Sequence, residues 1–284
     1  SPTLTENVVL RQETNIAIAG TITAGEGTNA RVFGVTPNGM FVPTDRLWPQ
    51  AGITWHGLDV RATSLPVAFA LRRGVNAWSL DKWKATKLDD ELEIRQGVAL
   101  TGRFRTVNGL RFYFTREGYW LRHKDIIMVF DRHKFPDFVG EGTKWIDISL
   151  ANQTLVAYEG KKPLYATLIS SGRDRLGDAN EGPSTLQGTF TLQKKYVVSD
   201  LDNREVKQEH DLLNVPWVME FADGFAIVAA TWHARFGEAL GFHHVGLAPI
   251  DAHLLWHWTD PAVPQGWNSV TAPEAEATIV YVHK

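Results

Sequence analysis

Histidine is the residue type whose placement in this sequence most suggests chemistry. Five of the ten histidines, His233, His243, His244, His253 and His257, lie close together near the C-terminus. Imidazole is a common metal ligand and an acid or base near neutral pH, so the cluster could bind a metal or transfer protons. The apolar residues around it favour a plainer interpretation, in which these rings pack in or on a folded core.

One pair in this cluster has helical spacing. His253 and His257 are four residues apart, as in the zinc-binding helix of a metalloprotease, but Leu254 stands where such an enzyme needs its glutamate. The flanking residues are typical of a core. We therefore favour packed or surface histidines over metal ligands at these two positions.

The other three histidines allow a different site. In an extended segment, His243 and His244 point to opposite faces, so only one of them can enter a given groove. His244 together with His233 could form a two-histidine site if a carboxylate such as Glu220 or Glu238 joined them. We predict no resident cofactor, with His233 and His244 as the candidate ligands if a metal binds.

The chain contains no cysteine. This excludes disulfides, thiolate metal sites and any cysteine nucleophile. A protein that works by thioester chemistry is therefore ruled out, whatever its fold.

Composition limits the class of protein. The 284 residues carry 29 basic and 32 acidic side chains, for a net charge of −3, and the basic residues are scattered, which makes nucleic acid an improbable partner. No apolar run approaches the roughly 20 residues that a transmembrane helix needs. Because the chain starts at Ser1 rather than methionine, we expect that an export signal has been removed.

Short β-type runs separated by turn residues extend along most of the chain, so we predict a mostly β protein with one or two short helices. Residues 1–14 show no period and are expected to form an N-terminal arm. Residues 15–140 form a β region, and 141–284 a second domain. The segment 132–143, with its Pro and Gly residues, is expected to link them.

Two helices are considered. Pro249 suits the first turn of a helix, so 249–258 is predicted to be helical, and 83–92 could form a helical turn. Two other segments, 31–47 and 112–126, repeat one order of strand, Gly-bearing turn and aromatic strand. This repeated hairpin resembles bacterial SH3-like modules, which implies an SH3-like all-β region over 15–140.

Segments of the second half together resemble the catalytic domain of L,D-transpeptidases of the YkuD type. They are, in order, 145–159, 166–172, 188–190, 215–221, 232–237, 258–261 and 264–267. The resemblance implies that 141–284 folds as a YkuD-like β-sandwich. Members of the family cleave the stem tetrapeptide of peptidoglycan, form a thioester on a cysteine, and pass the acyl group to an amine of a neighbouring stem.

The family signature pairs a histidine with a cysteine in Ser/Thr-His-Gly-Cys-apolar-Asn. The position of the cysteine is taken here by His244, and that of the catalytic histidine, sixteen residues earlier, by Val228. The other motif positions are also replaced, by Gly241, Phe242, His243 and Gly246. Valine cannot accept a proton, and no residue from 241 to 246 carries a thiol or hydroxyl, so the family chemistry has no nucleophile.

We therefore predict a non-catalytic, pseudoenzyme-like protein of the periplasmic or extracellular cell envelope. Its expected partner is a peptidoglycan stem peptide or an envelope protein. The predicted groove is bordered by Met219, Trp232, His233, His243 and His244. The alternative is a repurposed enzyme, a hydrolase or transferase that uses His244, with or without a metal.

Overall fold

The protein is mostly β with one α-helix, as the sequence predicts. The structure is a computed structural model, and the predicted arm at 1–14 lies outside its described residues. The described residues are 15–37, 39–49, 52–174, 176–201 and 212–284. Within them, no helix is long and apolar enough to span a membrane.

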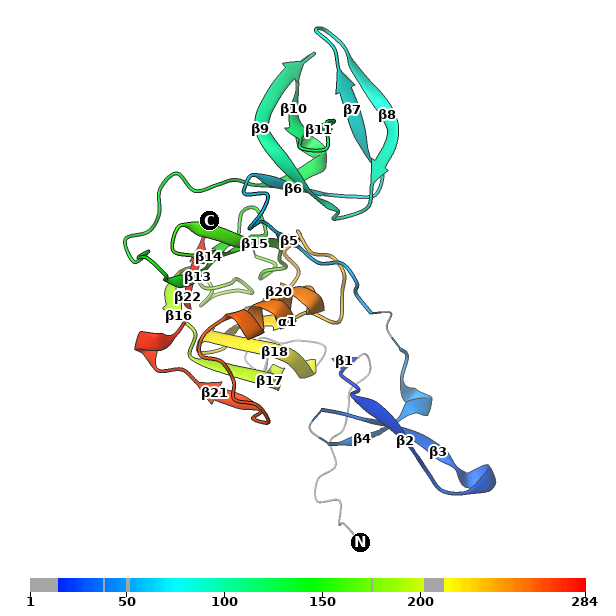
Figure 1. The fold of residues 1–284 in the computed structure, drawn as a ribbon. Coiled ribbons are helices and arrows are strands. Elements are labelled where there is room, and N and C mark those ends of the chain that lie inside the picture. The colour runs from blue at the N-terminus through cyan, green and yellow to red at the C-terminus, as the bar shows by residue number, and fades with distance from the viewer. Residues whose placement is uncertain (1–14, 38, 50–51, 175, 202–211) are drawn as a thin grey trace.

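A seven-stranded antiparallel sheet forms the unit at the top of Figure 1. Its strand order is β12-β6-β9-β10-β11-β7-β8. The bounds are β6 Val67–Ala70, β7 Val75–Leu80, β8 Ala85–Leu92, β9 Gly97–Val107, β10 Leu110–Thr115, β11 Trp120–Arg122 and β12 Ile126–Val129. Apolar side chains such as Leu100, Tyr113 and Leu121 are buried inside it, so this unit has a core of its own.

The helical turn considered for 83–92 is wrong, because β8 occupies most of that segment. The strand pairs with β7 from Leu80↔Ala85 to Val75↔Leu92, and the Asn76 amide donates a hydrogen bond of 2.8 Å to Glu91. Its charged residues favour a helix only weakly. Pairing with β7 satisfies the backbone hydrogen bonds of β8 and outweighs that preference.

The two repeated segments form the same hairpin in two different sheets. In each, a threonine backbone N–H donates to the carbonyl four residues later, from Thr36 to Met40 and from Thr115 to Tyr119, both at 2.9 Å. The threonine Oγ1 accepts the return bond, at 2.9 Å from Met40 and 3.2 Å from Tyr119. The first hairpin belongs to a separate three-stranded sheet of β2 Gly20–Ala24, β3 Arg31–Val35 and β4 Phe41–Pro43.

The C-terminal half consists of two sheets with apolar side chains between them. One has the order β16-β22-β13-β14-β15-β5, and the other the order β20-β19-β18-β17-β21 with β1 beside β18. The bounds of the first are β16 Gly188–Thr191, β22 Ile279–His283, β13 Lys144–Ser149, β14 Thr154–Glu159, β15 Lys162–Leu168 and β5 Leu58–Asp59. Those of the second are β20 Val245–Leu247, β19 Phe225–Ala229, β18 Leu212–Ala222, β17 Lys194–Leu201, β21 Ser269–Thr271 and β1 Asn15–Ile16.

The helix α1 spans Pro249–Trp258, which confirms the prediction for 249–258. Proline fits its first turn because the backbone N–H that it lacks would have no partner there. Leu255 and Trp256 join a buried cluster with Ile148 of the first sheet and Ile227 of the second. The largest apolar core therefore lies between the two sheets and includes one face of the helix.

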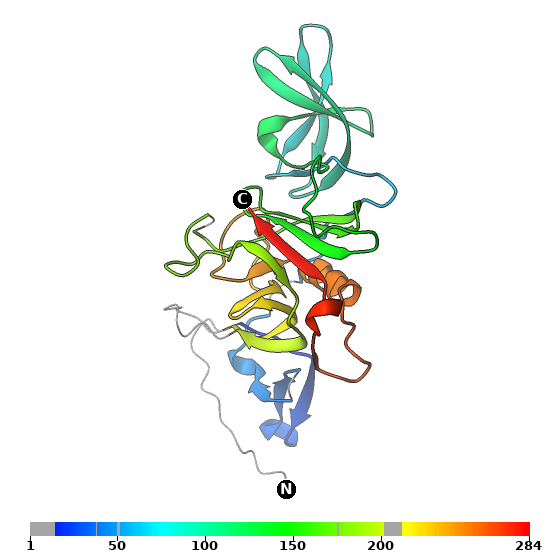
Figure 2. The same ribbon diagram turned by 90° about the vertical axis from the view of Figure 1, so that its left-hand side faces the viewer.

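The C-terminal unit lies between the three-stranded sheet at one end and the seven-stranded sheet at the other (Figure 2), and segments of the N-terminal half pair with its strands. Strand β1 pairs with β18 in parallel, and β5 extends the first sheet beside β15. Next to β5, the Gly57 N–H donates to the buried carboxylate of Asp251 at 3.0 Å, and the Tyr165 hydroxyl donates to it at 2.6 Å. The segment 132–143 has no regular element, but Arg132 binds Asp147 at 2.5 Å.

Candidate functional site

The candidate site lies where β19 and β20 run in parallel. Val228 on β19 is the register partner of Gly246 on β20, and its side chain is fully buried. The backbone of Gly246 is also bonded in both directions to Ser170, at 2.8 Å each way. Val228 is therefore an apolar core position, held by strands on both sides.

His244 immediately precedes β20 and is buried, with an exposed fraction of 6%. Its ring and that of Trp232 pack edge to face, with the centroids 5.6 Å apart and the planes at 87°. A Cβ on Gly241 would lie 3.3 Å from the His244 Nε2 atom, so the glycine leaves the space that the imidazole fills. Burial, and then the neighbouring His233 and His243, lower the pKa of His244 to about 4, which keeps the ring neutral at pH 7.

His243 and Phe242 turn towards different neighbours and stay half-buried. The His243 ring stacks on Phe225, with centroids 5.0 Å apart and an angle of 27°. The guanidinium of exposed Arg173 lies over the Phe242 ring at 4.5 Å. Residues 242–244 form a bend rather than a strand, and their three side chains contact different partners.

The loop after β19 carries the remaining predicted site residues, Trp232 and His233, which lie beside each other with centroids 6.1 Å apart. His233 accepts a hydrogen bond at Nδ1 from the Arg235 N–H, at 3.2 Å. Burial, followed by the charges of Arg235 and Arg95, lowers the pKa of His233 to about 4. His233 is therefore a neutral ring at the edge of the site.

The structure does not add a carboxylate to His233 and His244. Glu238 forms ion pairs with Arg235 and, at 3.5 Å, with Arg95, and Glu220 lies 3.8 Å from Lys194. Throughout the described ranges, no three histidine, aspartate or glutamate side chains gather in a way that could hold a metal ion. Neither carboxylate that the sequence offered completes a site with the two histidines.

Met219 lies away from the surface. Its side chain is fully buried in the core between the sheets, and its sulfur accepts a hydrogen bond of 3.5 Å from the Thr259 hydroxyl. It therefore supports the strand beside β19 and cannot border a groove that is open to solvent.

Two residues of the N-terminal half complete the site, and the sequence analysis missed both. The guanidinium of Arg95, which is buried, donates to the Phe236 carbonyl at 2.7 Å. The Trp55 ring stacks on Phe236 at 5.6 Å, and its Nε1 donates to the Arg95 carbonyl at 2.7 Å. Together they fix the loop that carries Trp232 and His233. No local sequence signal shows this, because the contacts join residues about 140 positions apart in the case of Arg95.

The hydroxyl groups next to the segment 241–246 are not available to solvent. The two hydroxyls beside the motif, those of Ser170 and Ser171, are fully buried, and Ser171 Oγ accepts a hydrogen bond of 2.7 Å from Gln153. His244 is neutral but has little access to solvent. The surface around it can instead stack against flat groups and bind carboxylates through Arg173.

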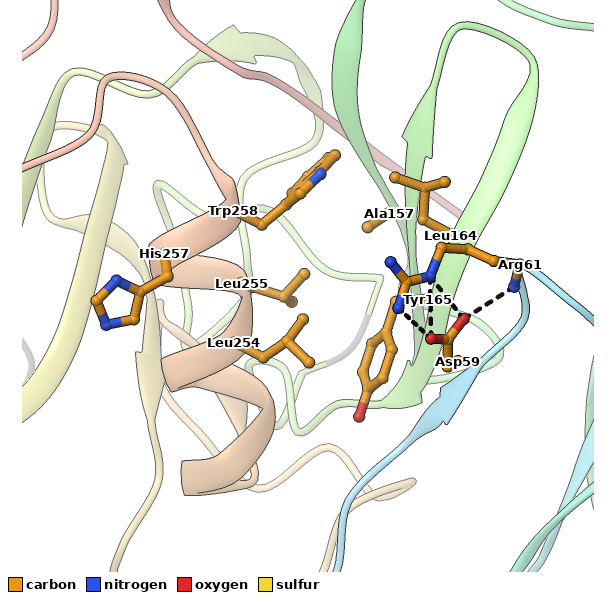
Figure 3. Close-up of a pocket in the computed structure, with 9 residues that line it drawn as sticks. All are labelled: Asp59, Arg61, Ala157, Leu164, Tyr165, Leu254, Leu255, His257 and Trp258. Carbon is orange, nitrogen blue, oxygen red and sulfur yellow. Dashed lines mark hydrogen bonds and ion pairs between the residues drawn. The ribbon is translucent and has the colours of Figure 1, made fainter.

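A hollow that we call the second cavity lies beside α1, away from the predicted groove residues. It is a cavity of about 360 Å³ between the helix and the β14–β15 hairpin, and apolar side chains such as Leu164 and Leu254 form most of its wall (Figure 3). The exposed ion pair of Asp59 and Arg61 stands at its edge. It shares no lining residue with the predicted groove.

Comparison with known proteins gives a structural resemblance only. No protein-family profile matches the sequence, and no curated protein matches it. The catalytic domain of the Enterococcus faecium L,D-transpeptidase, solved by NMR, is 19% identical with a TM-score of 0.37, over 50% of this chain and 98% of that one. An L,D-transpeptidase from Mycobacterium smegmatis is 17% identical with a TM-score of 0.40, over 64% of this chain and 77% of that one.

The L,D-transpeptidase (Yku) from Stackebrandtia nassauensis is a third example. It is 17% identical with a TM-score of 0.37, and the match covers 54% of this chain and 62% of that one. The protein thus resembles L,D-transpeptidase catalytic domains over about half of its length, and it has no cysteine.

Proposed function

We propose that this protein is a non-catalytic component of the bacterial cell envelope that binds a peptidoglycan stem peptide. The observation that carries the proposal is His244, a buried neutral imidazole at the position where the sequence resemblance places the nucleophile. Around it, Val228 is apolar, and 241–246 offers neither thiol nor hydroxyl. In this proposal the protein keeps a fold like that of the enzymes, but it has other side chains where they carry the nucleophile and its base.

The exposed rim supports binding. The exposed guanidinium of Arg173 lies over the half-buried Phe242 ring, two residues before His244, and the half-buried Trp232 contacts the His244 ring. A stem peptide carries free carboxylates and flat amide groups, which a guanidinium and aromatic faces bind without any chemical step. A protein of the envelope is the other partner that such a surface could hold.

The periplasmic or extracellular location belongs to the same proposal. It rests on the resemblance of the sequence to envelope enzymes. The alternative of a repurposed hydrolase or transferase gains no support from His244, because its ring is too buried to meet a substrate without rearrangement.

Calorimetric titration with soluble disaccharide-tetrapeptide tests the proposal. We expect saturable binding by the full chain and a loss on the order of tenfold in Arg173→Ala, since a hydrogen bond to a charged group contributes roughly 1.5–3 kcal/mol. Arg111→Ala is the matched control, because Arg111 also lies over an aromatic ring, that of Phe104 at 5.3 Å, but in the seven-stranded sheet. No binding of the peptide by the unmodified chain would refute the proposal. An equal loss of affinity in Arg173→Ala and Arg111→Ala would show that the peptide does not bind at Arg173.

A further inference from the structure

The exposed face of α1 holds a pair of histidines that the candidate site does not use. His253 and His257 are four residues apart on the helix, and both are exposed. Their Nε2 atoms lie 3.0 Å apart, and their ring planes cross at 89° with centroids 4.6 Å apart. The two nitrogens thus converge on one point in front of the helix.

This separation suits a particular coordination geometry. With metal–nitrogen bonds of about 2.0–2.1 Å, two nitrogens 3.0 Å apart subtend an angle of roughly 95° at the metal. A tetrahedral ion needs nitrogens about 3.3 Å apart, whereas neighbouring positions of a square-planar or tetragonal ion need about 90°. The pair therefore matches divalent copper, and after it nickel, better than zinc.

The rings are held in place from behind. Trp217 has a φ of 55°, a left-handed conformation that is rare for a bulky side chain. In that conformation its indole packs on His253 at 4.5 Å, on His257 at 5.9 Å and on buried Trp256 at 5.1 Å. Packing against a rigid indole limits the freedom of both imidazoles, so less entropy is lost when they bind an ion together.

We propose that His253 and His257 form a surface site for Cu²⁺, with both Nε2 atoms as ligands and water in the remaining positions. Without metal, the same 3.0 Å contact is a hydrogen bond in which one Nε2–H donates to the other ring. Binding requires both rings to carry their proton on Nδ1, a tautomer change with no net loss of protons. His257 also lines the edge of the second cavity, although its ring points away from Leu254 and Leu255 (Figure 3).

Titration of the full chain with Cu²⁺, followed by electron paramagnetic resonance and calorimetry, tests the site. We expect the unmodified chain to bind one equivalent of Cu²⁺ that gives a tetragonal signal with two nitrogen ligands. His253→Ala and His257→Ala should each lose this equivalent. The loss of affinity at that equivalent should exceed about tenfold, since even outer-shell partners of metal ligands contribute about 10- to 100-fold. Zn²⁺ should bind the unmodified chain more weakly than Cu²⁺.

Two controls locate the ion. His133→Ala removes an exposed histidine outside the helix and should leave the equivalent intact. Bound Cu²⁺ should quench Trp217, so Trp217→Phe should reduce the amplitude of fluorescence quenching while the stoichiometry stays unchanged. The variants His253→Gln and His257→Gln, which keep a polar side chain on the exposed face, guard against loss of folding. The proposal is overturned if all four histidine variants of the helix keep the affinity and the signal of the unmodified protein, or if His133→Ala loses the equivalent instead.

Discussion

The buried imidazole of His244 should make the protein less stable in acid. Its pKa is about 4 in the folded protein, compared with an ordinary value of 6.5. As the pH falls below 6.5, the unfolded chain takes up a proton at this position and the folded chain does not, so the free energy of unfolding decreases. The contribution of His244 is complete above pH 6.5 and is lost progressively between pH 6.5 and pH 4.

The size of the effect follows from the pKa difference. A difference of about 2.5 pH units, at about 1.36 kcal/mol each, gives roughly 3 kcal/mol in full, of which about 2.5 kcal/mol is lost by pH 4.5. His244→Gln replaces the ring with a side chain that does not titrate. The free energy of unfolding of the unmodified protein should therefore fall by about 2.5 kcal/mol more than that of His244→Gln between pH 7.0 and pH 4.5.

Urea unfolding followed by tryptophan fluorescence at the two pH values measures this difference. His133→Gln is the matched control, because that histidine is exposed. If His244→Gln and the unmodified protein lose the same stability, then folding does not lower the pKa of His244. The description of a buried, neutral ring at the nucleophile position would then be incorrect.

Two further changes test the packing around the site. Gly172→Ala places a Cβ 2.2 Å from the Phe242 carbonyl oxygen and should lower the free energy of unfolding in urea by about 3 kcal/mol. Gly20→Ala is the control, because its Cβ would have nothing within 4 Å, and should change this free energy little. Equal losses in the two variants would contradict the packing described around Gly172. Asp251→Asn replaces the carboxylate that accepts the Tyr165 hydroxyl hydrogen bond with an amide. It should lower the free energy of unfolding by about 2 kcal/mol in the same assay. An unchanged free energy of unfolding would mean that the Asp251 carboxylate does not stabilise the fold through this bond.

The sequence predicted those parts of the fold that local pattern determines. The helix at 249–258 has a proline in its first turn, and the β runs alternate with turns. The segment 83–92 was predicted less well, because its charged residues carry no strong signal and its conformation depends on pairing with β7. Tertiary pairing decides such segments, and one sequence does not reveal it.

The site was predicted in part for the same reason. The structure places Val228 on β19, opposite Gly246 of β20, and the buried His244 just before β20. The contribution of Arg95 and Trp55 depends on how the two halves of the chain meet, which no motif encodes. Met219 is buried because its side chain lies on the face of β18 that meets the core, and the sequence does not show which face that is.

The central claim is that the protein holds a stem peptide without reacting with it. Mass spectrometry after incubation of the purified chain with disaccharide-tetrapeptide, alone and with an acceptor amine, tests this most directly. We predict the intact mass of the protein and unchanged muropeptides, under conditions in which titration shows the peptide to be bound. A covalent adduct on the protein, or a cross-linked product that disappears in His244→Gln, would contradict the account.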